Sequence, residues 1–348
     1  MAGNKPVTIG HDYSAEVLFP EKGTPDMPPW VLPLIVRRVA SQETANQVAA
    51  EQLAQLMKAA GLPFHAALCV QVADSAYSAI TYLGRVAAHA NLVSIARLPT
   101  NRVVYHPFER DADQPNPVGH PTWYGARLAL NDPSTWSEPD ETAETMYTTR
   151  RGRTLTVQLS GWHNLLRRGT RELPMHQYPF TLVRAHVVDA DGQPLYKRDL
   201  WLIVIGQRRG ELALLEIWDA YDQRYDIEHF FRYSKQRLLM AAFQTPDVAH
   251  EENWWQIVQL AYLHLFLAQR LAHALPRPWE RYLPQHPPDN APPATVQRDF
   301  ARIISQIGTP AQAPKRRGNS PGRPAGTKLP PRERQPVIKK GQQVPKAA

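Results

Sequence analysis

Four side chains that can bind charged ligands lie within one short segment, residues 219–240. They are Tyr221, Arg224, Glu228 and Lys235. At about 100° per residue of an α-helix, these positions fall within a strip roughly 60° wide. The strip combines a carboxylate, which can bind a hard cation, with two cations that can bind anionic oxygens. The spacing favours a site built on a helix; the alternative is a solvated face with charge pairs at i,i+3 and i,i+4.

The strip requires a helix that presents it, and the sequence predicts one continuous helix over Asp219–Met240. An apolar arc lies beside the charged strip, so this helix can pack on one side and carry polar groups on the next. The arc consists of Ile227, Phe230, Phe231 and Leu238. The apolar run Leu212–Ile217 is predicted to be a strand that leads into the helix.

A further acid, Asp74, follows directly after a predicted strand. The run Ala66–Ala73 is mostly apolar and is predicted to be a buried strand of a parallel or mixed sheet. A helix over residues 79–90 and a strand over residues 92–98 complete an α/β unit. In open α/β sheets, functional sites lie just beyond the carboxyl ends of strands, where Asp74 is placed. The alternative is that Asp74 only caps the following helix.

The remaining patterns outline the rest of the fold. A strand-like segment, Pro6–Pro20, is followed by a Pro-rich connector to Pro33 and a helix capped by Ser41 that ends at Gly61. Further elements are predicted as strands at 154–159, 180–188 and 200–205, a hairpin turn at 189–192, a long helix that begins near His250, and a short helix at 295–307.

Composition places the basic charge in the tail. The chain has 348 residues and a net charge of +8, and residues 315–348 hold ten Lys and Arg against one acid, so the other residues sum to about −1. The single cysteine, Cys69, excludes an intrachain disulfide. Polar residues interrupt the longest apolar stretch, Trp254–Leu275, so we predict no membrane span.

The spacing Tyr-x2-Arg-x3-Glu-x6-Lys and its flanks resemble the signature of one group of DDE transposases, the enzymes of bacterial cut-and-paste insertion sequences. The segment Val72–Tyr77 resembles the second catalytic aspartate motif of that family. The resemblance implies an α/β, RNase H-like catalytic core with a β-rich insertion between the second aspartate and the glutamate helix, plus a disordered basic C-terminal tail. The expected domain ranges are core 1–100, insertion 101–210, core 211–284 and tail 285–348.

The resemblance also implies roles for individual residues. Asp74 and Glu228 are expected to be catalytic and to bind two Mg²⁺ (or Mn²⁺) ions, which activate the attacking oxygen and stabilise the leaving oxygen. Tyr221, Arg224 and Lys235 are expected to hold DNA phosphates. The expected partners are the transposon ends and the target DNA, with a homodimer forming on paired ends. The expected location is the bacterial cytoplasm, in association with the nucleoid.

The third carboxylate of such a site has no clear match. Asp12 is the only early acid on a strand-like segment, and its flanks do not resemble the family's first aspartate motif. We therefore expect the chain to lack the family's N-terminal part, including a central strand. Three functions follow as hypotheses: a DNA transposase, a catalytically incomplete DNA-binding relic, or a host nuclease of the same fold.

The tail has two interpretations. Lys315, Arg316, Arg317 and Arg323 lie in segments that resemble the Gly-Arg-Pro cores of A·T-rich minor-groove binders. The favoured interpretation is a generic polybasic tail that binds phosphates by counterion release. The high content of Pro, Gly and charge predicts disorder in the free protein.

Overall fold

The structure is a computed structural model. It describes residues 11–21, 27–109, 122–149, 152–243, 245, 247–272, 291–308, 326 and 328. The predicted tail cations Lys315, Arg316, Arg317 and Arg323 lie outside the described residues. None of the helices in the described part of the chain combines the length and apolarity that a membrane span needs.

The secondary structure mixes helices and strands throughout the described chain. The α-helices are α1 (Ala45–Lys58), α2 (Ile80–Val86), α3 (Leu214–Gln223), α4 (Asp226–Arg237), α5 (Val248–Leu267) and α6 (Pro293–Ile307). The strands are β1 (Asp12–Leu18), β2 (Leu32–Val39), β3 (Cys69–Ala73), β4 (Leu92–Leu98), β5 (Val103–Pro107), β6 (Tyr124–Ala129), β7 (Glu141–Thr148), β8 (Thr154–Leu165), β9 (Phe180–Asp189) and β10 (Leu200–Ile205). Short 3-10 turns are η1 (Ser75–Ser78), η2 (Pro133–Thr135), η3 (Met175–Gln177), η4 (Arg209–Glu211) and η5 (Gln269–Leu271).

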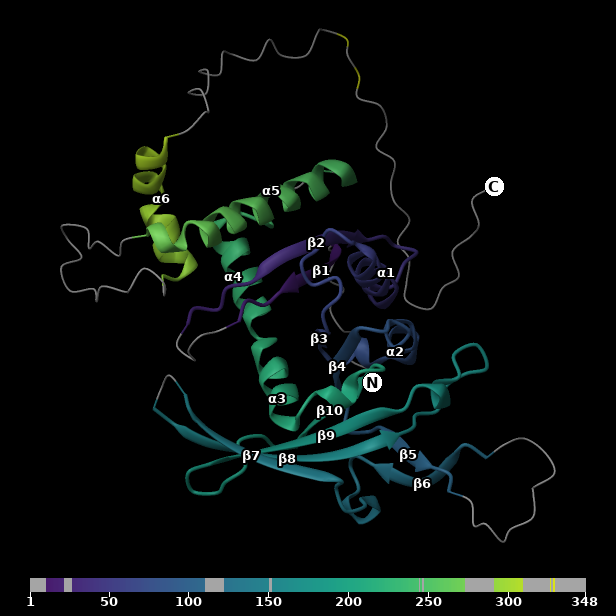
Figure 1. Ribbon diagram of the computed structural model, residues 1–348. Coiled ribbons are helices and arrows are strands. Elements are labelled where there is room, and N and C mark those ends of the chain that lie inside the picture. Colours follow the sequence, from purple (N-terminus) through teal and green to yellow (C-terminus); the bar gives the residue numbers. More distant parts are fainter. Residues whose placement is uncertain are drawn as a thin grey trace, which may run out of the picture.

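A six-stranded sheet in the order β3-β4-β10-β9-β8-β7 forms the centre of the molecule. β3 and β4 are parallel, and the other neighbours in the sheet are antiparallel. Figure 1 shows this sheet as one curved layer, with α3 and α4 rising from it toward α5. The strands of the predicted insertion, β7 to β10, therefore continue the sheet of β3 and β4. A mixed α/β fold of this kind is consistent with a DDE nuclease.

The two faces of the sheet are covered by different helices. Successive residues of a strand point to opposite faces, and β10 shows this clearly. Ile203 packs with Leu53 of α1 and Leu83 of α2, whereas Leu202 belongs to the core formed with Ile217 and Trp218 of α3. The result is a three-layer arrangement with helices on both faces.

β1 and β2 form a separate two-stranded antiparallel sheet. A third core joins this region to α4, α5 and α6 through Trp30, Phe230, Tyr262 and Ile303. β2 was not predicted, because Pro28, Pro29 and Pro33 give its sequence the character of a connector. Pro33 is tolerated because its register with Val17 falls at a shift in the pairing, where a missing N–H costs little.

The predicted strand Leu212–Ile217 is wrong, because α3 already begins at Leu214. Glu216 accepts a hydrogen bond from the backbone N–H of Ala213 at 2.8 Å and so fixes the start of the helix. The first long helix also starts later than expected: Thr44, not Ser41, caps α1 by accepting from the N–H of Gln47. Similarly, Asp247 rather than His250 caps α5.

The predicted single helix Asp219–Met240 is interrupted. The N–H groups of Arg224 and Tyr225 bond to the carbonyls of Tyr221 and Asp222, each at 3.2 Å and three residues back. This tighter 3-10 winding separates α3 from α4 and turns the chain by about 120° per residue instead of 100°. The predicted strip is therefore rotated between Tyr221, which is buried, and Glu228, which is exposed.

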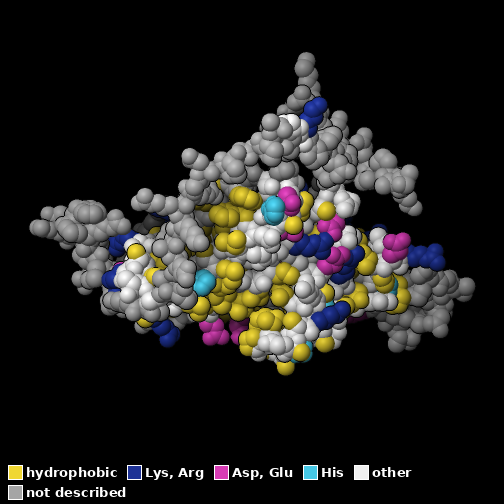
Figure 2. All heavy atoms as spheres, turned by 90° about the horizontal axis from the view of Figure 1, so that it is seen from above, with side chains coloured by type: hydrophobic (Ala, Val, Ile, Leu, Met, Phe, Trp, Pro, Cys, Tyr) yellow, Lys and Arg dark blue, Asp and Glu magenta, His cyan; other side chains and the backbone are white. Residues whose placement is uncertain are grey.

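α5 carries an apolar surface that other described residues do not bury. Ile257, Leu260 and Leu267 are 56%, 55% and 74% exposed. Figure 2, seen from above, shows hydrophobic side chains gathered on this side of the molecule.

Candidate functional site

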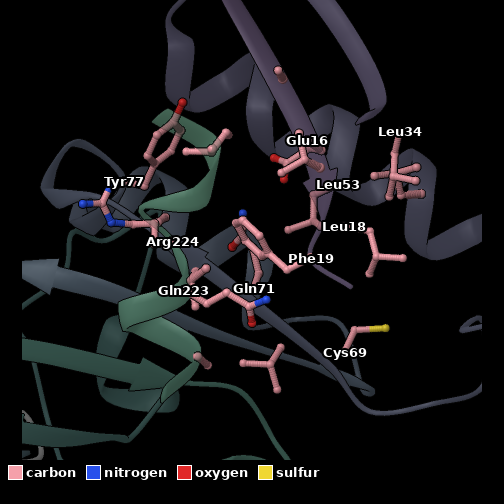
Figure 3. A pocket seen from close by; sticks show the side chains of 18 of the residues that line it. Glu16, Leu18, Phe19, Leu34, Leu53, Cys69, Gln71, Tyr77, Gln223 and Arg224 are labelled. Atoms are coloured by element: carbon pink, nitrogen blue, oxygen red, sulfur yellow. The ribbon is translucent and has the colours of Figure 1, made fainter. Parts of the chain in front are cut away.

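A cavity of about 590 Å³ lies between β1, β3, α1 and the α3–α4 junction. Figure 3 shows side chains from these elements around it, among them Glu16, Gln71 and Arg224. Asp74 and Glu228, the two predicted catalytic acids, also line this cavity, although they are 154 residues apart in the sequence. The structure thus brings together the two features that the sequence analysis selected independently.

Asp74 lies at the end of β3 and is held by its own backbone surroundings. Its Oδ1 accepts a hydrogen bond from the N–H of Ala76 at 2.8 Å, which caps η1. Asp74 is therefore a cap residue, as the alternative interpretation predicted. Its side chain also borders the cavity, so the cap does not exclude a second role. A carboxylate has several acceptor positions, so one cap leaves others available.

Tyr77 of η1 links Asp74 to a second acid. Burial raises the pKa of Tyr77, and the nearby carboxylates of Glu16 and Asp74 raise it further. The two acids therefore act on one hydroxyl at the wall of the cavity. Tyr77 itself lines the cavity (Figure 3).

Glu228 lies in the first turn of α4, where the helix dipole favours negative charge. Its side chain is 51% exposed, and its Oε1 is 3.8 Å from Nη1 of Arg224. An exposed pair at this distance contributes little to stability. Glu228 therefore has a free carboxylate at the mouth of the cavity.

Arg224 is held between two aromatic rings at the break between α3 and α4. Its guanidinium carbon lies 5.4 Å from the ring centre of Tyr221 and 4.9 Å from that of Tyr225. The Nε atom is buried and has no hydrogen-bond partner among the described residues. Such stacking fixes the direction of a guanidinium and leaves donors for an anion.

The other two predicted phosphate-binding residues, Tyr221 and Lys235, differ from Arg224 in their surroundings. Tyr221 is only 5% exposed and belongs to the core under α3. Burial raises the pKa of its hydroxyl, while Arg224 and Arg97 act in the opposite direction. Lys235 is exposed on α4, with its ammonium 5.8 Å from the ring centre of Phe231, and it does not line the cavity.

Glu16 of β1 is a cavity residue that the sequence analysis missed. Burial raises the pKa of Glu16 to about 7, although a hydrogen bond with the side chain of Gln71 lowers it in part. Gln71 also accepts from Ser94 Oγ at 2.8 Å and donates to the hydroxyl of Tyr82. One feature of the sequence could have pointed to Glu16. It is an acid on the same face of the strand as Ser14, which is buried.

Asp12, the weak candidate for a third ligand, is exposed at the start of β1 and does not line the cavity. Within the described residues there is no group of three or more His, Cys, Asp or Glu side chains placed to hold a metal ion. Asp74 and Glu228 suit a hard cation as oxygen ligands. Glu16 is a further carboxyl group that lines the same cavity.

A comparison with protein families matches the first part of the chain. Residues 1–168 match the model of a family described as DDE superfamily endonuclease. The matched segment contains Asp74 and stops before Glu228. The match supports a DDE-type nuclease or transposase family, whose members act on DNA. A comparison with curated protein sequences gave no match.

Proposed function

We propose that this chain is a DDE-type transposase that cleaves and joins DNA strands at the ends of a bacterial insertion sequence. The observation that carries the proposal is that Asp74 and Glu228 line one cavity. The family match over residues 1–168 and the Tyr-Arg-Glu-Lys spacing support the same class of enzyme.

Each residue has a role in this proposal. Asp74 and Glu228 are the acids of the catalytic site and the ligands of Mg²⁺ or Mn²⁺. Arg224, whose guanidinium lies against two aromatic rings, binds a DNA phosphate beside Glu228. Tyr221 orients Arg224 from the core, and Lys235 binds a phosphate further along the exposed side of α4.

A second function is favoured by a different observation. Among the described residues, no three His, Cys, Asp or Glu side chains are grouped so that they could hold a metal ion. The alternative is therefore a protein of the same class that binds DNA without cleaving it. Both functions predict DNA binding, and they differ in whether strands are broken.

A nicking assay separates the two functions. Supercoiled plasmid is incubated with the purified full chain and Mg²⁺ or Mn²⁺, and nicked product is measured on gels. The transposase proposal expects nicking that Asp74→Asn and Glu228→Gln each reduce by at least about 100-fold. Nicking that survives both substitutions refutes the assigned site, and DNA binding without any nicking favours the alternative.

A further inference from the structure

The turn that follows Asp74 is held by an arginine from a distant part of the chain. At one end of η1, Asp74 accepts a hydrogen bond from the N–H of Ala76 and caps the turn. At the other end, the backbone carbonyl of Ser78 accepts a hydrogen bond from Nη1 of Arg167, which is 89 residues away in the sequence. One acid and one guanidinium therefore fix the two ends of η1.

η1 depends on contacts from outside itself. It is four residues long, and the backbone hydrogen bond from Tyr77 to the carbonyl of Asp74 is long, at 3.3 Å. Short 3-10 turns have poor hydrogen-bond geometry. Asn46 of α1 donates to the carbonyl of Ala76 at 3.1 Å, but this contact is exposed to solvent. The contact from Arg167 is partly buried, so water competes with it less.

The backbone that carries Arg167 is fixed by β5 and β6. Directly before it, Leu166 and Tyr105 exchange both backbone hydrogen bonds, at 2.7 and 2.9 Å. The hydroxyl of Tyr124 donates to the carbonyl of Arg167 at 3.4 Å. Directly after it, the guanidinium of Arg168 lies over the rings of Tyr105 and Tyr124, 4.9 and 5.7 Å from their centres. Arg167 therefore reaches η1 from a backbone that is held on both sides.

The charge of Arg167 opposes folding. Burial, together with the nearby charge of Arg102, lowers the pKa of Arg167 to about 10. Within the described part of the chain, its guanidinium donates to the carbonyl of Ser78 and forms no ion pair with an acid. A partly buried charge without an acid is costly. Stability alone therefore does not account for an arginine at this position.

We propose that Arg167 is a positioning residue, which holds η1 and thereby fixes the direction of the Asp74 carboxylate at the cavity. Arg167 does not itself line the cavity, so it acts through the turn and not on the reacting atoms. The inference rests on the proposed function, because it takes the catalytic role of Asp74 from there. It adds that the β5–β6 sheet supports the site through one side chain.

A small displacement of η1 is enough to change the rate. Ser78 is 2% exposed, so the loss of Arg167 leaves its carbonyl without this donor in a buried position. A buried carbonyl that loses its donor favours a conformation in which water or another donor reaches it. A shift of about 1 Å in a catalytic group can lower a rate about 100-fold.

The test compares two arginines that each donate to a backbone carbonyl. Arg167→Ala removes the contact with η1. The matched control is Arg209→Ala, since Arg209 donates to the carbonyl of Gly206 at 3.2 Å, burial also lowers its pKa, and it does not line the cavity. The purified full chain is assayed for plasmid nicking at saturating DNA and for duplex affinity by fluorescence anisotropy.

The expected result separates rate from affinity. We expect Arg167→Ala to lower the nicking rate per folded molecule at least about 10-fold, while the affinity for DNA stays within about twofold of the wild type. We expect Arg209→Ala to leave both within about twofold. Equal losses of nicking in the two variants would show a general loss of stability and overturn the inference.

A second readout does not require nicking. The backbone amide of Ala76 is bonded to Asp74, so its hydrogen exchange reports on the order of η1. We expect this exchange to be at least about 10-fold faster in Arg167→Ala and unchanged in Arg209→Ala. Arg167→Lys keeps a charged donor without the planar guanidinium, and we expect it to be intermediate in exchange and in nicking. If the Ala variant does not fold, a Lys variant equal to the wild type in both readouts overturns the inference.

Failure of the inference and failure of the proposed function give different results. If the wild type nicks, Asp74→Asn does not, and Arg167→Ala nicks at the wild-type rate, the inference is wrong and the proposed function stands. If the wild type does not nick, the proposed function fails. The exchange at Ala76 then decides whether Arg167 holds η1, and unchanged exchange in Arg167→Ala refutes it.

Discussion

Asp74, at the end of β3, and Glu228, in the first turn of α4, line the same cavity. One acid is fixed by a backbone cap, and the other is exposed and only loosely paired with Arg224. The two carboxylates therefore differ in how their neighbours hold them, and at both positions an amide of the same shape removes the charge.

Asp74→Asn should preserve the fold and remove the charge. The amide oxygen of Asn can still accept from the N–H of Ala76, so we expect the melting temperature to change by less than about 2 °C. Nicking activity should fall at least about 100-fold. The matched control is Asp132→Asn, since Asp132 caps η2 in the same way but does not line the cavity. Equal effects of the two substitutions on nicking would count against Asp74 as a catalytic residue.

Arg224→Ala should weaken DNA binding and reduce its salt dependence. One lost phosphate contact lowers the slope of log K against log salt by about 0.9. The control is Arg208→Ala, because Arg208 is already bonded to Glu211 on the surface. Fluorescence anisotropy with a labelled duplex at several salt concentrations gives both slopes. The same slope change in both variants would show that position 224 has no special role.

Glu16→Gln should make stability less dependent on pH. The pKa of Glu16 is about 7 in the folded chain, above its ordinary value of 4.5. Ionisation therefore opposes folding: stability is highest below about pH 4.5 and falls as the pH rises toward 7, by ~3 kcal/mol at most. The Gln variant should melt higher than the wild type at pH 8 and at nearly the same temperature at pH 4.5.

Glu51→Gln is the control of opposite sign. Hydrogen bonds from Gln47 and Arg37 lower the pKa of Glu51, so this carboxylate favours folding above its ordinary pKa and loses that effect as the pH falls. The Glu51 variant should melt at or below the wild type at pH 8. If both variants shift the melting temperature in the same direction, the buried state of Glu16 is refuted.

Gly206→Ala should destabilise the sheet by ~2 kcal/mol or more. Gly206 has φ of 148°, and an added Cβ would lie 2.3 Å from the carbonyl oxygen of Leu92. The control is Gly210→Ala, where a Cβ meets nothing within 4 Å and the effect should be neutral or slightly stabilising. Urea unfolding of both variants measures the difference, and equal stabilities would contradict the close approach at Gly206.

The tail prediction can be tested by two charge-matched variants. One replaces Lys315, Arg316, Arg317 and Arg323 by Gln, and the other replaces Arg332, Arg334, Lys339 and Lys340 by Gln. A generic polybasic tail predicts the same loss from each, with the salt slope reduced by about 3 to 4. A larger loss from the first variant, confined to A·T-rich duplexes, would support the minor-groove interpretation. Melting temperatures should be unchanged in both.

Much of the sheet was predictable, because its buried strands are continuous apolar runs between turn residues. Strands were predicted where β3, β4, β9 and β10 occur, and so was the position of Asp74 at a strand end. Short apolar runs are ambiguous between helix and strand. That ambiguity explains the error at Leu212–Ile217, which the cap from Glu216 to Ala213 resolves in favour of a helix.

Parts of the site could not be predicted, because they depend on contacts between distant segments. Burial raises the pKa of Glu16, and its hydrogen-bond partner Gln71 lies on another sheet. No Gly or Pro near Arg224 in the sequence indicates the break between α3 and α4. The metal-ligand roles, the DNA contacts and the division into domains remain predictions.

β4 pairs with β10, a strand that is synthesised much later, so the sheet cannot form until β10 has been made. Ile95 and Val204 are partners in the sheet. At about 5 to 20 residues per second, a ribosome needs roughly 5 to 20 seconds to make the chain between them. During that interval the apolar edge of β4 is available to other nascent chains. We therefore expect the yield of folded protein to depend on chaperones that shield β4 until β10 emerges.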